Sequence, residues 1–528
     1  MTSPATTSVA QSELQEYLYY RQQRRRLLPR AALVGLVSGL MAVLFRAVLA
    51  SGDNLRLRIC TTAHQMGGAG GLIPVCYSMC LAALAVFLVV KFSPDAAGSG
   101  IPHLEAVLHR YRAIRWKPLI AVKFLGGAAS LSSGLVLGRE GPTVQMGGAV
   151  GDAISRWLKV TEPDRMVLIA AGAGAGLAAA FNAPLSGLVF VLEEVQRDFR
   201  PAVFGSAFVA ATVADIVARF ASGQLPVFHV PACVAPPMQS IPLFILLGAI
   251  TGVIGVGYCR SIIVGLNLLQ KTPRNAKIAY AAFMGAAAGI AGYFHPDLIG
   301  GGHHLAERVL SANMAFTIIP MLLLARIGLS VFSYATGAPG GIFAPLLGMG
   351  ALTGLAVGLA AHNAWPSVVP QPAAFAVAGM AAMFTAIVRA PLTGIVLIVE
   401  MTGSYSLMLP LLMVCFCAYA VAELLGEMPI YENLLERDLR NNGIETSSPE
   451  PFVLHLEVMP GAPFDGCLVQ DLGLPPGCIL LKCEDQEANS WVPTATTRLV
   501  RHLQLTALIS PEVVGGVEAL KAGCDTAI

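Results

Sequence analysis

The stretch GREGPTVQMGGAVG, residues 138–151, puts a carboxylate at the head of an apolar segment. Charged side chains inside such segments are rare and costly, so Glu140 is a functional candidate by default. Pro142 suits the first turn of a helix, and the glycines of the stretch let a backbone come close to a ligand. Free amides at a helix start carry partial positive charge and attract anions. The stretch therefore predicts a helix that begins at an anion site.

The surrounding chain is too apolar for a soluble protein. Of its 528 residues, 55% are hydrophobic and only 12% are charged, whereas soluble domains carry about a quarter charged residues. We therefore predict an all-α polytopic membrane protein. The net charge of +2, without a basic stripe that carries interleaved aromatics, predicts no nucleic-acid partner. The eleven cysteines include no C-x-x-C pair and no zinc-spaced cluster, so no metal site is expected.

Many apolar segments are too short or too interrupted to cross a bilayer, which takes ~20 apolar residues. Some are long enough, such as 73–92, 240–259 and 407–425. Three others are broken by GSGIP, SSG and GREGP: 101–112, 119–133 and 142–157. A helix that ends inside a bilayer leaves unpaired amides, which only protein or a polar cavity can satisfy. Such broken helices predict a binding site near the middle of the membrane.

The chain also repeats itself. Three stretches of the first half match stretches of the second half in the same order and at nearly constant spacing. The pairs are PDAAGSGIPHLEAVL (94–108) with PDLIGGGHHLAERVL (296–310), GREGPTVQMGGAVG (138–151) with GIFAPLLGMGALTG (341–354), and NAPLSGLVFVLEE (182–194) with RAPLTGIVLIVEM (389–401). Ordered matches of this kind predict a duplicated membrane domain. The residues alone fit a parallel and an inverted arrangement of the two halves equally well.

Two further glycine-rich breaks have the architecture of GREGP. GSGIP (98–102) offers the hydroxyl of Ser99 and two glycines, and GGIFAP (340–345) offers backbone amides. Together the three helix starts make an anion site without a cationic side chain, which would hold the anion too tightly to release it. The alternative is that these glycines serve close helix packing. We assign that role to GAGAG (172–176), because no strand precedes it as a dinucleotide-binding loop requires.

Taken together, these motifs resemble the CLC family of chloride channels and transporters from about residue 30 to residue 438. GSGIP, GREGP and GIFAP occur in the family's order, followed by a tyrosine in a short final helix, MPIYENLL (428–435). The resemblance implies a CLC-type inverted repeat of broken and tilted helices, assembled as a homodimer in a cell membrane, here a bacterial inner membrane. It implies chloride and protons as the transported species, with no cofactor.

The resemblance also implies an anion site built from hydroxyls and amides. Its residues are Ser99, Gly100, Ile101, Gly341, Ile342, Phe343 and Tyr431. In this arrangement Ser99 and Tyr431 coordinate chloride through their hydroxyls. Ile342 and Phe343 supply backbone amides.

The gate implied by the resemblance is Glu140, flanked by Arg139 and Gly141. Its ionised carboxylate takes the anion's place, and its protonated form swings away. Physical chemistry gives the same expectation, because an ionised carboxylate in a low dielectric is costly and a neighbouring anion raises that cost. Binding of a proton and binding of chloride are therefore linked. A glutamate that only caps its helix is the alternative interpretation.

Two acidic residues end the apolar segment VFVLEEV (189–195). Glu193 aligns with Glu400 of the second half, which favours a structural role for that pair, whereas Glu194 aligns with Met401. By resemblance, Glu194 matches the inner proton glutamate that antiporters of the family carry, so the predicted proton pathway joins it to the gate. Lys123 and Glu105 also occupy positions typical of the family, and we assign them only packing or ion-pair roles.

The chain is expected to fall into four parts: a cytoplasmic arm (1–30), a transmembrane domain (31–438, with repeats at about 31–225 and 238–425), a linker (439–450) and a soluble domain (451–528). The arginines that end the arm predict a cytoplasmic amino terminus, and within the arm a short surface helix and a solvated stretch are equally acceptable. In the soluble domain, hydrophobic and polar residues alternate as they do in the strands of a small α+β fold. It resembles the RCK/TrkA carboxy-terminal regulatory domain, which implies a small-molecule ligand and a cytoplasmic carboxy terminus.

Chloride/proton antiport is the favoured function. The alternatives are a passive chloride channel, gated by voltage or pH, and a transporter that senses a ligand through its last domain. A fluoride or nitrate exporter is less favoured, because relatives with those preferences replace the serine that matches Ser99. An enzyme is not expected, because the sequence offers no nucleophile–base pair, no metal cluster and no Walker loop.

Overall fold

The computed structural model describes residues 4–66, 68–224, 226–228, 236–311, 314–443, 451–485, 489–510, 513 and 515–525. The chain forms two units, one from Leu18 to Asp438 and the other comprising Leu439–Ile528 together with Met1–Tyr17. Residues 444–450 of the expected linker lie outside the described residues.

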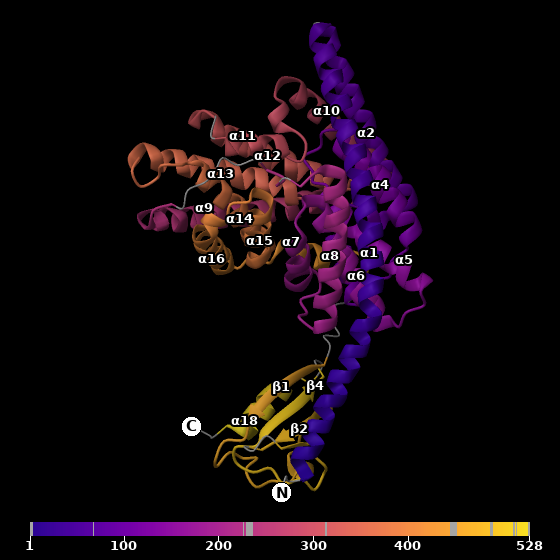
Figure 1. The fold of residues 1–528 in the computed structure, drawn as a ribbon, viewed down its shortest axis with the longest axis vertical. Helices are drawn as coiled ribbons and strands as arrows, with labels where there is room; N and C mark the ends of the chain where they lie inside the picture. The colour runs from indigo at the N-terminus through magenta and orange to yellow at the C-terminus, as the bar shows by residue number, and fades with distance from the viewer. Residues whose placement is uncertain are drawn as a thin grey trace. The chain divides into compact units, whose positions relative to one another are not determined.

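The larger unit is a bundle of α-helices (Figure 1). Its longer helices are α1 (Pro4–Gln65, of which the part from Leu18 onward belongs to this unit), α2 (Leu72–Phe92), α6 (Glu162–Phe181), α8 (Pro201–Ser222), α9 (Ile241–Leu268), α10 (Arg274–Phe294) and α13 (Phe343–Ala364). Its shorter helices are α3 (Ile101–Leu108), α4 (Trp116–Ser132), α5 (Glu140–Trp157), α7 (Pro184–Phe190), α11 (His303–Leu310), α12 (Ile319–Ala335), α14 (Ala373–Val388), α15 (Pro391–Thr402), α16 (Met408–Leu424) and α17 (Ile430–Asn441). Short helical turns are η1 (Gly68–Gly71), η2 (Pro94–Ala96), η3 (Val191–Val195), η4 (Met238–Ser240), η5 (Pro296–Leu298), η6 (Phe316–Ile318) and η7 (Tyr405–Leu407).

Within the described residues, 8 helical stretches are long and apolar enough to cross a membrane. The protein is therefore a multi-pass membrane protein. The three long segments expected from the sequence appear as α2, α9 and α16, and the interrupted ones as the short helices α3, α4 and α5.

Helix α1 differs from the expected polar arm followed by a separate span. It runs without interruption from Pro4 to Gln65, through the boundary expected at residue 30, with Pro29 inside it. The arm is rich in Gln, Glu, Leu and Arg, which are good helix formers, so a helix that starts in the apolar span extends through it.

Glycines bring helices of the bundle into close contact. A Cβ placed on Gly172 of α6 would meet the carbonyl oxygen of Gly147 on α5. In the second half, Gly379 of α14 stands against Gly350 of α13 in the same way. The packing role predicted for GAGAG is therefore confirmed, and the contact recurs in both halves.

Two carboxylates show how the halves are related. Glu193, at the end of the α7–η3 segment, accepts hydrogen bonds from the amide of Thr393 at 2.7 Å and from its hydroxyl at 2.7 Å, at the start of α15. Glu400, near the end of α15, accepts from the amide of Ser186 at 2.8 Å and from its hydroxyl at 2.6 Å, at the start of α7. Corresponding helices therefore run antiparallel, which confirms the inverted repeat.

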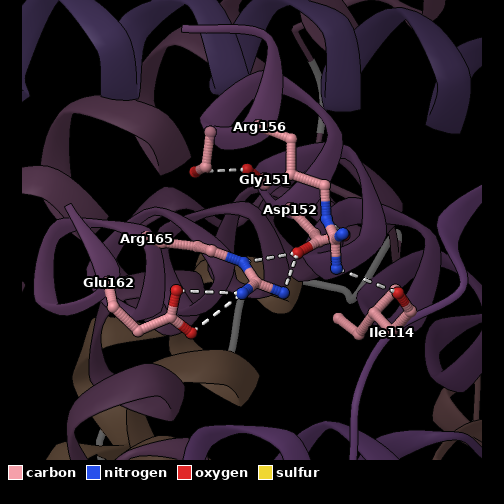
Figure 2. A network of polar contacts seen from close by, with 7 residues as sticks. Ile114, Gly151, Asp152, Arg156, Glu162 and Arg165 are labelled. Carbon is pink, nitrogen blue, oxygen red and sulfur yellow. Dashed lines mark hydrogen bonds and ion pairs between the residues drawn. The ribbon is translucent and has the colours of Figure 1, made fainter. Parts of the chain in front are cut away.

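The far end of α5 is fixed by ion pairs around a buried carboxylate (Figure 2). Asp152, fully buried, accepts from Nε of Arg156 at 2.9 Å and from Nε of Arg165, on α6, at 2.7 Å. Arg165 also pairs with Glu162 at 2.8 Å, and Arg156 donates to the carbonyl of Ile114 at 3.4 Å. The helix that starts at Glu140 is thus anchored to α6 and to the loop before α4.

The smaller unit carries a four-stranded antiparallel sheet in the order β1-β4-β2-β3. The strands are β1 (Phe452–Glu457), β2 (Cys478–Glu484), β3 (Ser490–Trp491) and β4 (Gln504–Ile509), accompanied by η8 (Val469–Asp471) and α18 (Gly516–Cys524). Leu505, Ala507 and Ile509 of β4 point into a core that also contains Leu480 and Leu520. The predicted small α+β domain is confirmed, and it has a hydrophobic core of its own.

Candidate functional site

The heads of α5 and α13 meet at the centre of the membrane unit. The amide of Gly138 donates to the carbonyl of Gly341 at 2.6 Å, and the amide of Gly341 donates to Gly138 at 2.7 Å. Glu140 follows at once and is 1% exposed. Its Oε2 accepts a hydrogen bond from the amide of Ala344, at the start of α13, at 3.3 Å. The carboxylate of one half therefore binds an amide at the helix start of the other half.

The neighbours of Glu140, Arg139 and Gly141, contact other parts of the site. The guanidinium of Arg139 donates to the carbonyl of Ala180 at 3.2 Å, at the end of α6. A side chain on Gly141 would collide with the backbone of Ser99, at 2.6 Å from its carbonyl oxygen. Glycine is required there because the GREGP and GSGIP motifs touch through their backbones.

Ser99 lies in the turn that opens α3 and is 1% exposed. Gly98 and Gly100 both have positive φ, 57° and 85°, which side chains rarely adopt. The amide of Ser99 donates to the hydroxyl of Tyr334 at 3.4 Å. The amide of Ile101 points to the Ser99 hydroxyl at a distance of 3.5 Å.

A buried amine braces the Ser99 loop. Lys123 is 0% exposed, and its Nζ donates to the carbonyls of Ala96 at 3.1 Å and Gly98 at 2.7 Å. In the second half Arg326, also 0% exposed, donates to the carbonyl of Gly300 at 3.0 Å. Lys123 therefore binds backbone carbonyls of this loop, and the repeat provides its counterpart.

The remaining predicted anion ligands are buried. Ile342 and Phe343 are 0% exposed, and the Phe343 ring packs with its centroid 4.5 Å from that of Phe384. Tyr431, at the start of α17, is 0% exposed. Its hydroxyl has no hydrogen-bond partner among the described residues. It lies within electrostatic range of Glu140.

Glu194 lies in η3, a π-helical turn that continues α7; such turns are frequent at functional sites. It is 3% exposed. Its Oε1 lies 3.8 Å from Nη2 of Arg197 and has no hydrogen-bond partner within the described part of the chain. A cavity of about 510 Å³ beside it is lined by Glu432 and other acidic side chains together with Arg197 and Arg389. Glu105 of α3, 3% exposed, lies within electrostatic range of Glu194.

Three contacts of the site escaped the sequence analysis. The Ala344 amide binds Glu140, the Tyr334 hydroxyl binds the Ser99 loop, and Glu432 pairs with Arg197. The sequence signals differ. Ala344 directly follows Ile342 and Phe343, whose amides were predicted to bind the anion. No sequence pattern indicates a role for Tyr334 or Glu432. Groups of three or more metal-ligating side chains do not occur among the described residues.

Comparisons with known proteins agree with this geometry. The profile of the family described as voltage gated chloride channel matches residues 81–423. The chain is 41% identical to the H(+)/Cl(−) exchange transporter ClcA of Vibrio parahaemolyticus over 423 residues, which is 78% of this chain and 90% of that protein. It is 36% identical to the transporter of the same name from Salmonella paratyphi A over 465 residues, 85% of this chain and 98% of that protein.

Among solved structures, the fold resembles that of a slow cyanobacterial Cl−/H+ antiporter. The TM-score is 0.77 at 35% sequence identity, over 79% of this chain and 99% of that one. A eukaryotic CLC transporter shares the fold with a TM-score of 0.67 at 22% identity, over 88% of this chain and 78% of that one.

Proposed function

The chain belongs to the voltage gated chloride channel family, the CLC family, and we propose that it exchanges chloride for protons across the membrane. The relatives reported above are named as H(+)/Cl(−) exchangers, and they align over most of their length. The observation that carries the proposal is the bond between the Glu140 carboxylate and the Ala344 amide. A carboxylate in that position competes with an anion, and the carboxylate accepts a proton when it leaves the amide.

The anion route runs past the three helix starts and Tyr431. Chloride is the substrate there, and the exchange requires no cofactor. The Tyr431 hydroxyl, unpartnered among the described residues, is available to donate to an anion. Ser99 offers a second hydroxyl at the turn braced by Lys123. A site of amides and hydroxyls binds a halide without a full positive charge, so release stays fast.

The proton route departs from Glu140 toward Glu194. Support comes from the burial of Glu194, its unpartnered oxygen within the described residues, and the cavity beside it. A buried carboxylate next to a cavity can exchange protons with water, and Oε1 of Glu194 makes no hydrogen bond within the described residues. Glu193, by contrast, is bound to the start of α15.

The experiment is chloride-driven proton movement in proteoliposomes of the purified protein. Chloride that leaves the vesicles down its gradient should draw protons inward, so an external pH electrode records alkalinisation against the proton gradient. A chloride current with no proton movement would instead establish the passive-channel alternative.

We also propose the assembly and setting of the transporter. It functions as a homodimer in a bacterial inner membrane, with both termini in the cytoplasm; the arginines before the first span support that orientation. The α+β domain acts as a regulatory domain of RCK/TrkA type that binds a small molecule. Its separate hydrophobic core supports an independent role.

A further inference from the structure

Arg197 stands between two carboxylates and bonds with only one of them. Its Nη1 forms a direct ion pair with Oε1 of Glu432. Its Nη2 lies 3.8 Å from Oε1 of Glu194, which is too long for a hydrogen bond. All three side chains line the same cavity. The guanidinium is thus held within reach of Glu194 but bonded elsewhere.

The backbone places Arg197 in this position. The residue follows the π-turn η3 with φ of 52°, a left-handed conformation that non-glycine residues adopt rarely and at a cost. Glu432 comes from a different element, α17, directly after Tyr431. The repeat does not duplicate the arrangement, since Met401 stands at the position that matches Glu194. It is therefore specific to the inner end of the first half.

Most charged groups around Glu194 are acidic, and the second cation that lines the cavity, Arg389, is paired with Glu423. The groups that face it are Glu105 from α3, Glu193 from its own turn, and Tyr431 and Glu432 from α17, besides Arg197. Arg197 is the single cation among these described groups. Whether it bonds to Glu194 therefore decides how readily that carboxylate exchanges a proton, because a carboxylate bound by a guanidinium is held ionised.

We propose that Glu432 is a positioning residue of the proton route: by binding Arg197, it keeps the guanidinium from capturing Glu194. This rests on the proposed antiport function. Without Glu432, two changes act in the same direction. Arg197 becomes free to bind Glu194, and a neighbouring negative charge disappears. Both favour ionised Glu194, so protonation requires a more acidic solution.

The test is Glu432→Gln in proteoliposomes, with chloride flux and chloride-driven proton flux measured from pH 4.5 to 8. Chloride flux should persist, which also reports that the protein is folded. The pH profile of proton flux should shift toward lower pH by about half a unit or more, since the pair is partly exposed. Glu432→Asp, which keeps the carboxylate, should restore the wild-type profile.

Two further variants separate capture from a general charge effect. Glu423→Gln neutralises another acid that lines the cavity, one paired with Arg389 instead, and should leave the profile unchanged. In the double variant Glu432→Gln with Arg197→Gln, no guanidinium is left to capture Glu194, and proton flux should recover. An unshifted profile in Glu432→Gln, or a double variant as impaired as the single one, overturns the role of Glu432. An uncoupled wild type overturns the antiport proposal instead.

Discussion

At the scale of single residues, the proposed exchange depends on one carboxylate that takes the place of an anion. Glu140 accepts a hydrogen bond from the amide of Ala344 at the start of α13, as a bound anion does at a helix start. Its oxygen competes with chloride only while ionised. The gate and the proton acceptor are then the same group.

Glu140→Gln should therefore keep chloride flux and lose both proton coupling and the pH dependence of that flux. A neutral amide can neither compete as an anion nor carry a proton. The measurement is chloride efflux and proton uptake from the same vesicles over a pH series. Chloride-driven proton uptake that persists in this variant contradicts the assignment of the gate.

The motif residues of the site could be predicted because glycine, proline and an intramembrane glutamate are unusual at their positions. The bonding pattern could not. Ala344 binds through its backbone amide, so its only signal is its place directly after the predicted amides of GGIFAP, and Glu432 resembles an ordinary charge on a helix surface. Lys123 is an intermediate case: a packing or ion-pair role was expected for it, but its carbonyl partners were not.

At the scale of elements, the reciprocal caps of α7 and α15 hold the two halves together. Each carboxylate accepts amide and hydroxyl bonds at the start of the opposite helix. This explains why Glu193 and Glu194 are neighbours in the chain with different tasks. Both line the cavity, but Glu193 is bound to the start of α15, whereas Oε1 of Glu194 has no hydrogen-bond partner among the described residues.

Glu193→Gln should lower the stability of the membrane unit by about 1–2 kcal/mol, as loss of a capping carboxylate does, and leave the coupling of chloride to protons intact. Thermal unfolding in detergent measures the first effect, and the vesicle assay measures the second. Loss of proton coupling without loss of stability would reverse the assignments of the two glutamates.

Helix positions followed from segment lengths and from the breaks at GSGIP and GREGP. The orientation of the repeat did not, because a parallel and an inverted duplication produce the same sequence pattern. The reciprocal bonds of Glu193 and Glu400 show that the two halves are inverted. The length of α1 also exceeded expectation. The residue types of the polar arm do not by themselves show whether it is helical or extended.

At the scale of the whole molecule, the chain is a membrane unit and a small α+β unit with separate cores. Every residue of the proposed transport route lies in the first. The division falls between Asp438 and Leu439, inside α17, and Met1–Tyr17 belongs with the small unit.

Truncation after Gly443 should leave a protein that inserts and transports, because domains with their own cores fold independently. Its chloride and proton fluxes would be compared with those of the full chain at equal protein. If the truncated protein fails to insert or loses all flux, the final domain is part of the transporter's fold. A small molecule that alters flux in the full chain alone supports the regulatory role.

The most direct test of the two-glutamate account is proton movement driven by chloride in vesicles that contain wild type or Glu194→Gln. Coupled fluxes are expected in the wild type. In the variant we expect retained chloride flux with no proton movement, because an amide cannot relay protons while the anion ligands are unchanged. Proton pumping at wild-type coupling by Glu194→Gln would contradict the two-glutamate account.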